Sequence, residues 1–225
     1  IALVVILTLC LSAGAMAATN QTTARAAAGP GEGSAVAFNT TDTAYIYTGS
    51  FRETTPVSVT GSIRLSATRG TTMNQDRATV NSQFRWEGST YRLSVTCSFP
   101  ISGQDFPGHG AVQFMRPVLG TADLGTLDLP ETEAQVAVYG RAAMTKDGTV
   151  IADNQPAIIM VHQAIHDGNQ ALMDTPDPSR SEISLIIPGP LNGQRFVKGF
   201  PNGYFYIYWP NPSITLSGNT SPLPM

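Results

Sequence analysis

The sequence predicts an all-β protein: an antiparallel β-sandwich with jelly-roll-like or Greek-key topology and about ten to twelve strands. Three observations lead to this prediction. Apolar and polar residues alternate with a period of two along several segments, as in strands with one buried and one solvated face. Asp-Gly and Asn-Gly pairs separate these segments, and such pairs favour hairpin turns. The 225 residues include 21 Gly and 16 Pro but only 13% charged residues, which indicates turn-rich structure with hydroxyl-covered strands.

The N-terminal segment is apolar and uncharged. Residues 1–17 are predicted to be a signal peptide whose start is missing, because Ala15-Met16-Ala17 fits the A-x-A cleavage pattern. The alternative is a retained apolar helix, as in pilin-like subunits. Residues 18–35 are small and polar and predict a flexible linker. We therefore expect a secreted, extracellular or cell-envelope protein, with no stable membrane span unless the N-terminal segment is retained.

Residues 36–225 are predicted to form a single sandwich domain. The clearest alternation runs from Val57 to Thr68, and a second runs from Thr90 to Phe99. Residues 120–133 are acidic and irregular, so they either divide the domain in two or form one long connection. Hairpin turns are expected at the sequences WEGSTY, KDGT, HDGN, LNGQ and PNGY.

The segment from Gly203 to Pro210 is the most aromatic of these strands. Phe205, Ile207 and Trp209 share one face, which is predicted to enter the core. The other face carries a row of tyrosines, predicted to lie either outward or under a second layer. The binding candidates are these residues and a similar pair upstream: Tyr204, Tyr206, Tyr208, Tyr45 and Tyr47. Exposed, such a row could stack on sugars or mediate self-association; the competing interpretation is cross-strand packing.

The spacing of the histidines predicts a strand that runs into a hairpin turn and not a metal centre. On a strand, His162 and His166 share a face about 13 Å apart. That distance is too long for one ion bound at about 2.1 Å by each nitrogen. Asp167 and Gly168, which follow, are expected to form a hairpin turn. Cys97 is expected on the core side of its strand, as the sole cysteine after the N-terminal segment.

The acidic residues of the 120–133 segment are weak calcium candidates, since calcium takes several oxygen ligands from one turn. They are Asp123, Asp128, Glu131 and Glu133. A solvated acidic loop is the competing interpretation. No other cofactor is expected, and no catalytic residue is assigned because nucleophile-elbow, P-loop and dinucleotide motifs are absent from the sequence. The net charge of −3, with scattered Arg and Lys, argues against nucleic-acid binding.

The expected function is therefore non-catalytic. The sequence favours an exported protein acting in binding, adhesion or a surface assembly, with carbohydrate or a second copy of the chain as partner. One alternative is a secreted polysaccharide-active hydrolase, which needs two paired carboxylates. The second is a pilin-like filament subunit with a retained N-terminal helix.

Overall fold

The structure is a computed structural model that describes residues 32–96, 111–122, 128–187, 197, 200 and 204–222. The predictions for residues 1–17, the first part of the linker, Cys97 and the turns at Asn192-Gly193 and Asn202-Gly203 lie outside these residues. Within the described ranges, no helix is long and apolar enough to cross a membrane. The all-β prediction is confirmed, since every strand pairing is antiparallel and the described elements include no α-helix.

Eleven strands and one short 3₁₀ turn make up the described fold. They are β1 (Gly33–Phe38), β2 (Thr43–Ile46), β3 (Val57–Arg69), the turn η1 (Met73–Gln75), β4 (Arg77–Trp86), β5 (Ser89–Thr96), β6 (Val112–Val118), β7 (Thr132–Lys146), β8 (Thr149–His166), β9 (Leu172–Ile187), β10 (Phe205–Pro210) and β11 (Ser213–Gly218). β1 begins two residues before the predicted end of the linker at residue 35, because Gly33 already pairs with Arg69 and Gly218.

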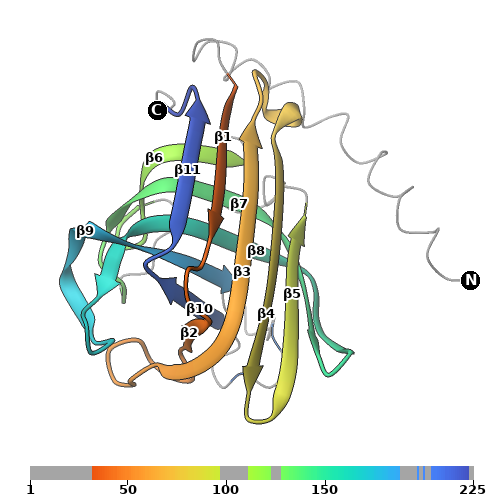
Figure 1. Cartoon of the computed structure of the whole chain (residues 1–225), viewed down its shortest axis with the longest axis vertical. Helices are drawn as coiled ribbons and strands as arrows, with labels where there is room; N and C mark the ends of the chain where they lie inside the picture. The colour runs from red at the N-terminus through yellow and green to blue at the C-terminus, as the bar shows by residue number, and fades with distance from the viewer. Residues whose placement is uncertain are drawn as a thin grey trace, which may run out of the picture.

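The strands close into an eight-stranded barrel with extra strands, which corrects the predicted sandwich. The closed path runs β3-β2-β10-β9-β8-β7-β5-β4, and pairing of β4 with β3 returns it to its start. β3, β4 and β5 run steeply across one side, and β7 to β9 cross behind them (Figure 1). Sandwich and barrel share the same alternation of faces, so the sequence pattern did not distinguish them.

The extra strands pair with those parts of the long barrel strands that extend beyond the ends of their neighbours in the barrel. β1 and β2 pair with successive halves of one edge of β3, and β11 adds to β1. In the same way, β5 and β6 share one edge of β7. β6 and β7 flank the acidic segment 120–133 and pair directly with each other.

The barrel interior is a packed apolar core. Phe205, Ile207 and Trp209 all point into it and are fully buried, as predicted from their alternation. Phe84 stacks on Tyr91 with ring centroids 4.8 Å apart and on Phe205 at 5.7 Å. Eight strands enclose a space that side chains can fill, and these rings fill much of it.

Two predicted hairpin turns are confirmed in detail. Glu87-Gly88 joins β4 to β5, and Asp147-Gly148 joins β7 to β8; all four residues have the positive φ angles of a type I′ turn. The predicted hairpin after His166 is also present, but its turn is longer. There Gln170, and not Gly168, adopts a positive φ of 67°.

A substitution at Gly61 tests how closely β3 and β4 pack where they close the barrel. Its position on β3 faces the barrel, and a Cβ there would lie 2.5 Å from the Cβ of Phe84 and 2.8 Å from the carbonyl of Gln83. We expect Gly61→Ala to lower the free energy of unfolding by about 1–3 kcal/mol through overpacking. Urea denaturation followed by tryptophan fluorescence measures this loss.

Gly168→Ala is the matched control, because a Cβ at Gly168 meets nothing within 4 Å. Its stability should stay within about 0.5 kcal/mol of wild type. Equal stability of the two variants would contradict the closure geometry.

Candidate functional site

A second core covers the outer face of the barrel on the side of β7 to β10. Three segments lie over this face: residues 47–56, the two ends of the connection 118–131, and the start of β9. The apolar residues of this second core are Tyr47, Phe51, Val118, Leu119, Leu129, Ala134, Ala137, Tyr139, Ile158, Met160, Ile165, Ile186, Tyr206 and Tyr208. The covering layer is made of loops and a hairpin, so the barrel carries two cores.

The tyrosine row lies beneath this layer, the second of its two predicted placements. Tyr206 and Tyr208 have no exposed surface, and Tyr47 is 2% exposed. Tyr45 and Tyr204 are half-buried at the edge of the same core. The exposed version of the row is therefore corrected: in this structure Tyr206 and Tyr208 offer no free ring face to a sugar.

A hydrogen-bonded chain of three side chains crosses the second core. The Tyr47 hydroxyl lies 3.0 Å from His166 Nε2, and His166 Nδ1 lies 2.9 Å from Glu182 Oε2. The other carboxylate oxygen of Glu182 accepts the backbone N–H of His166 at 3.1 Å. The His166 ring also stacks on Tyr208, with centroids 3.8 Å apart. The buried carboxylate is thus satisfied by two donors from one residue.

A second chain runs beside the first. His162 Nδ1 lies 2.7 Å from the Gln163 carbonyl, and Nε2 lies 2.7 Å from Ser184 Oγ. Ser184 Oγ is also 2.8 Å from the Tyr206 hydroxyl. Because a carbonyl only accepts, Nδ1 carries the His162 proton, and Nε2 accepts from Ser184.

The two histidines approach one carboxylate although a straight strand would separate them. His162 is the register partner of Glu182, whereas His166 bonds the Glu182 side chain. Irregularities in β8 between Gln163 and His166 make this possible, because they turn the end of the strand over the second core. Among the described residues, no group of three or more His, Cys, Asp or Glu is placed to hold a metal ion.

Burial sets the protonation of this network. It lowers the pKa of His162 below its ordinary value, so the imidazole is neutral. Burial, and then the negative charge of Glu182, raise the pKa of Tyr47, Tyr206 and Tyr208. All three phenols therefore keep their protons. The Tyr47 hydroxyl shares a hydrogen bond with His166 Nε2, and the Glu182 carboxylate accepts the one from His166 Nδ1.

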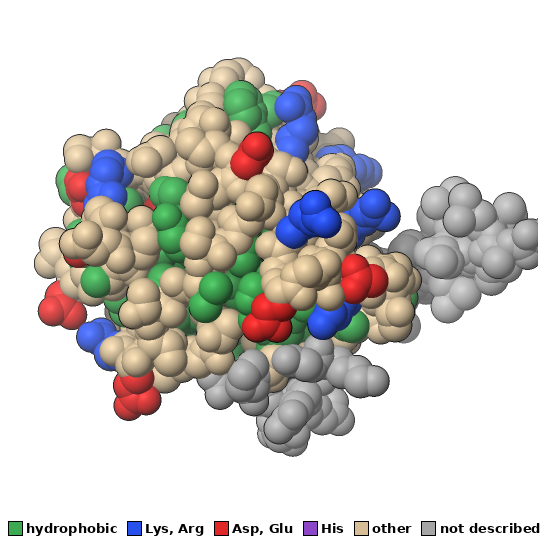
Figure 2. All heavy atoms as spheres, turned by 60° about the horizontal axis from the view of Figure 1, so that its bottom comes forward, with side chains coloured by type: hydrophobic (Ala, Val, Ile, Leu, Met, Phe, Trp, Pro, Cys, Tyr) green, Lys and Arg blue, Asp and Glu red, His purple; other side chains and the backbone are tan. Residues whose placement is uncertain are grey.

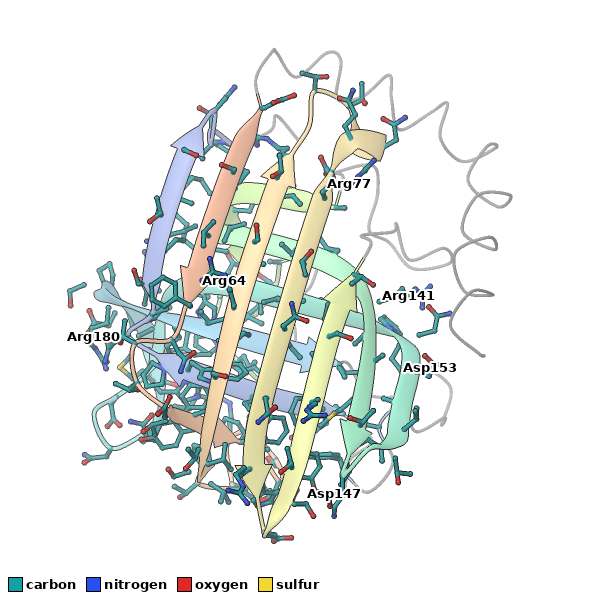
Figure 3. All side chains as sticks on the ribbon, turned by 45° about the vertical axis from the view of Figure 1, so that its right-hand side comes forward. Arg64, Arg77, Arg141, Asp147, Asp153 and Arg180 are labelled. Carbon is teal, nitrogen blue, oxygen red and sulfur yellow. The ribbon has the colours of Figure 1, made fainter. Side chains whose placement is uncertain are left out.

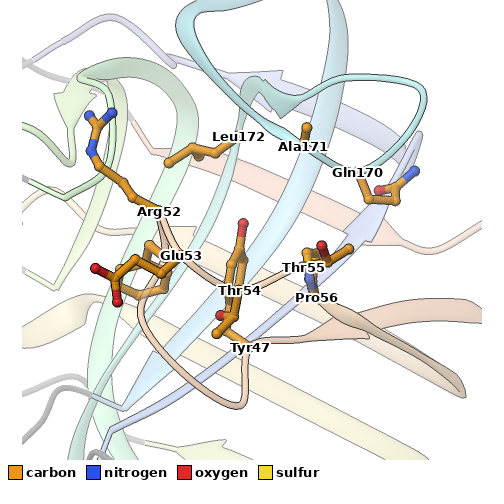
Figure 4. Close-up of a pocket in the computed structure, with 10 residues that line it drawn as sticks. Tyr47, Arg52, Glu53, Thr54, Thr55, Pro56, Gln170, Ala171 and Leu172 are labelled. Carbon is orange, nitrogen blue, oxygen red and sulfur yellow. The ribbon is translucent and has the colours of Figure 1, made fainter.

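A pocket of about 260 Å³ opens next to Tyr47 (Figure 4). Its lining consists of Tyr47, Phe51, Arg52, Glu53, Thr54, Thr55, Pro56, Gln170, Ala171 and Leu172. Gln170 Oε1 accepts the Tyr208 hydroxyl at 3.0 Å, so the Gln170 amide N–H groups remain for a ligand. Two polar groups of the lining, on Tyr47 and Gln170, are therefore oriented by the buried tyrosines and histidine.

The acidic calcium candidates that the structure describes form no group of three or more placed to hold a metal ion. Asp123 lies outside the described residues. Glu131 bonds the hydroxyl of Thr121, while Glu133 pairs with Pro117 of β6. The calcium site stays a prediction.

Sequence reasoning named Tyr47 but missed Glu182, Ser184 and Gln170. Glu182 and Ser184 alternate with Ile183 and Leu185, which face the barrel core. A carboxylate on the outer face of such an apolar strand was the available signal. It could not show that loops cover that face, because alternation specifies a side and not what lies above it.

Fold and site together define a class: an antiparallel all-β barrel with a second, polar-centred core beside a small surface pocket. No known protein family matches the sequence, and no curated protein or solved structure shows significant similarity to it.

Removing the Glu182 carboxylate tests the buried chain. Glu182→Ala leaves the Nδ1–H and backbone N–H of His166 without their acceptor in a site that is 2% exposed. We expect the free energy of unfolding to fall by about 3 kcal/mol or more. Asp174→Ala is the control, since Asp174 is 90% exposed in its pair with Arg52 and should cost less than about 1 kcal/mol. Similar losses in chemical denaturation would refute a stabilising role for Glu182.

His162 predicts a pH dependence of stability. Its folded pKa lies below the ordinary value, so below about pH 6.5 the unfolded state binds a proton that the folded state excludes. The contribution of His162 is therefore fully present above about pH 7. It is lost as the pH falls toward the folded pKa, by up to about 1.4 kcal/mol per pH unit.

Urea denaturation between pH 7.5 and pH 5 measures this slope. Because Glu182 and His166 face the same cluster, the informative quantity is the difference between wild type and His162→Gln. The variant should show the shallower slope, and identical slopes would contradict the assignment.

Proposed function

We propose that this chain is an exported, non-catalytic binding protein that holds a neutral sugar unit in the pocket beside Tyr47. The observation that carries the proposal is the fixed orientation of the pocket's polar groups. Tyr47 is held by His166 and Glu182, and Gln170 is held by Tyr208. Groups locked from beneath lose little conformational freedom when a ligand binds, and that favours affinity.

The chemistry of the lining favours a polyhydroxylated ligand. The Tyr47 hydroxyl is bonded to His166, and its oxygen has a further lone pair that can accept a hydrogen bond from a ligand hydroxyl. The Gln170 amide can donate one. Phe51, Pro56 and Leu172 add apolar surface for the C–H face of a sugar ring. The volume, about 260 Å³, is near the small end of ligand pockets and suits a single sugar unit.

The same pocket gives little support to the hydrolase alternative. Glycoside hydrolysis needs two carboxyl groups facing across the bond, about 5–9.5 Å apart. Glu53 is the one carboxylate of the described lining, and Glu182 is sealed behind Tyr47 and His166. Binding without bond cleavage is therefore the favoured activity. Export itself rests on the N-terminal sequence.

A glycan array probed with the full chain tests this function. At least one neutral glycan should be retained, and Gln170→Ala should weaken its binding about tenfold through loss of one hydrogen bond. Gln155→Ala is the matched control, because Gln155 is half-buried on β8 and outside the pocket lining. Absence of any neutral ligand, or equal affinity of Gln170→Ala and wild type, would overturn the proposal.

A further inference from the structure

A second surface of the barrel carries several arginine side chains and no carboxylate. It is the outer face of the adjoining strands β11, β1, β3, β4 and β5. The residues that alternate with the buried ones on these strands are Ser34, Val36, Phe38, Ser58, Thr60, Ser62, Arg64, Ser66, Thr68, Arg77, Thr79, Asn81, Gln83, Arg85, Thr90, Arg92, Ser94, Thr96, Ser213, Thr215 and Ser217. We call this set the arginine face. Apart from Val36 and Phe38, it consists of hydroxyls, amides and four guanidinium groups.

Among the described residues, no acidic side chain neutralises the guanidinium groups of the arginine face. Arg92 donates to the Gln83 side chain at 3.1 Å, and Arg77 donates to the backbone carbonyls of Asn74 and Asp76. The guanidinium groups of Arg64 and Arg85 have no hydrogen bond or ion pair with a described residue. All four side chains are exposed. Their positive charge is therefore available to a partner.

The strand register arranges these cations in a line. Arg64 lies opposite Asn81 on β4, and Arg92 lies opposite Gln83. With about 4.8 Å between strands and 3.4 Å per residue, successive arginines are about 8–14 Å apart. Arg77 and Arg85 end the line on β4, about 27 Å from each other. Figure 3 shows Arg64 and Arg77 on the strands that face the viewer. This length suits an extended chain better than a single small anion.

This separation of charge contrasts with the rest of the molecule, whose net charge is −3. At the lower end of the barrel, acidic and basic side chains are interspersed (Figure 2). The pair of Arg52 with Asp174 and the pair of Arg180 with Asp177 likewise lie off the arginine face. A polyanion would therefore be attracted to this face and repelled by carboxylates elsewhere. The charge distribution thus favours binding of the polyanion along the arginine face.

We propose that the arginine face binds an anionic polysaccharide along the line of its four arginines. Guanidinium groups bind carboxylate and sulfate bidentately, and the Ser, Thr, Asn and Gln side chains between them match sugar hydroxyls. Single-stranded nucleic acid is less well served, because it needs aromatic platforms for its bases and the face exposes one ring, Phe38. An anionic membrane is also a poorer match, since the face lacks an apolar patch to insert.

This proposal goes beyond the neutral-sugar pocket and shares no residue with it. Basic residues that are scattered in the sequence also come together in the fold. Positions 64, 77, 85 and 92 are separated by 13, 8 and 7 residues in the sequence, and all four are outward positions of adjoining strands.

Affinity electrophoresis of the full chain against polygalacturonate, dextran sulfate and unsubstituted dextran tests the proposal. One or both acidic polymers should retard the protein, with an effect that weakens as salt rises, whereas dextran should not. Retardation by polygalacturonate would identify carboxylate as the bound group, and retardation by dextran sulfate would identify sulfate. The double variant Arg64→Gln/Arg92→Gln should weaken binding at least about tenfold.

Arg52→Gln/Lys146→Gln is the matched control, because it removes two exposed cations that lie off the face. It should retain affinity within about threefold, as loss of long-range attraction alone is screened by salt. Gln170→Ala should bind acidic polymers like wild type, so failure of this proposal is distinct from failure of the pocket. Three outcomes would overturn it: no retardation by either acidic polymer, equal losses in both double variants, or tighter binding to poly-dT or phosphatidylglycerol vesicles.

Discussion

The register that joins β3 to β4 is the constraint on which the rest of the structure depends. It closes the path of eight strands into a barrel, and closure satisfies both edges of the strands on that path. Once the barrel is closed, every strand has an inner face and an outer face. The inner faces merge into one apolar core. The outer faces divide into the covered side of β7 to β10 and the exposed arginine face. Both candidate binding surfaces follow from this division.

On the covered side, the physical problem is a carboxylate removed from water. Glu182 is 2% exposed, and burying an unpaired charge would be costly. The Nδ1–H and backbone N–H of His166 offset this cost, and the Tyr47 hydroxyl completes the chain. Tyr47 stands at the start of the segment 47–56 that covers this core, so the network also fixes the loop lining the pocket. Stability and the arrangement of the pocket lining therefore have a common origin in this cluster.

The exposed side solves a different problem, that of presenting a strand surface to solvent in a protein with few charges. Hydroxyl and amide side chains hydrate the face, and the four arginines provide its charge without acidic neighbours. The proposed neutral-sugar pocket and the proposed anionic-polymer face are compatible on one molecule, because they lie over different strands and use different chemistry. Together they describe a protein that could hold a polysaccharide along one side and a single sugar unit on another.

Local features follow directly from the linear sequence. Alternation placed β3 from Val57 and sent Phe205, Ile207 and Trp209 into the core, and Asp147-Gly148 specified its turn. These features depend on neighbours within a few residues, so a linear pattern suffices. Other features exist only in the folded chain. They are the closure of the barrel and the loops that cover Tyr206 and Tyr208. The hydrogen bond between Tyr47 and His166 and the alignment of the arginines on β3 and β5 likewise need the complete fold. Tyr47 was a candidate from sequence, but Glu182 and Gln170 were not. The reason is physical: a period of two shows which side of a strand a residue occupies, whereas what lies above that side depends on pairings across more than a hundred residues.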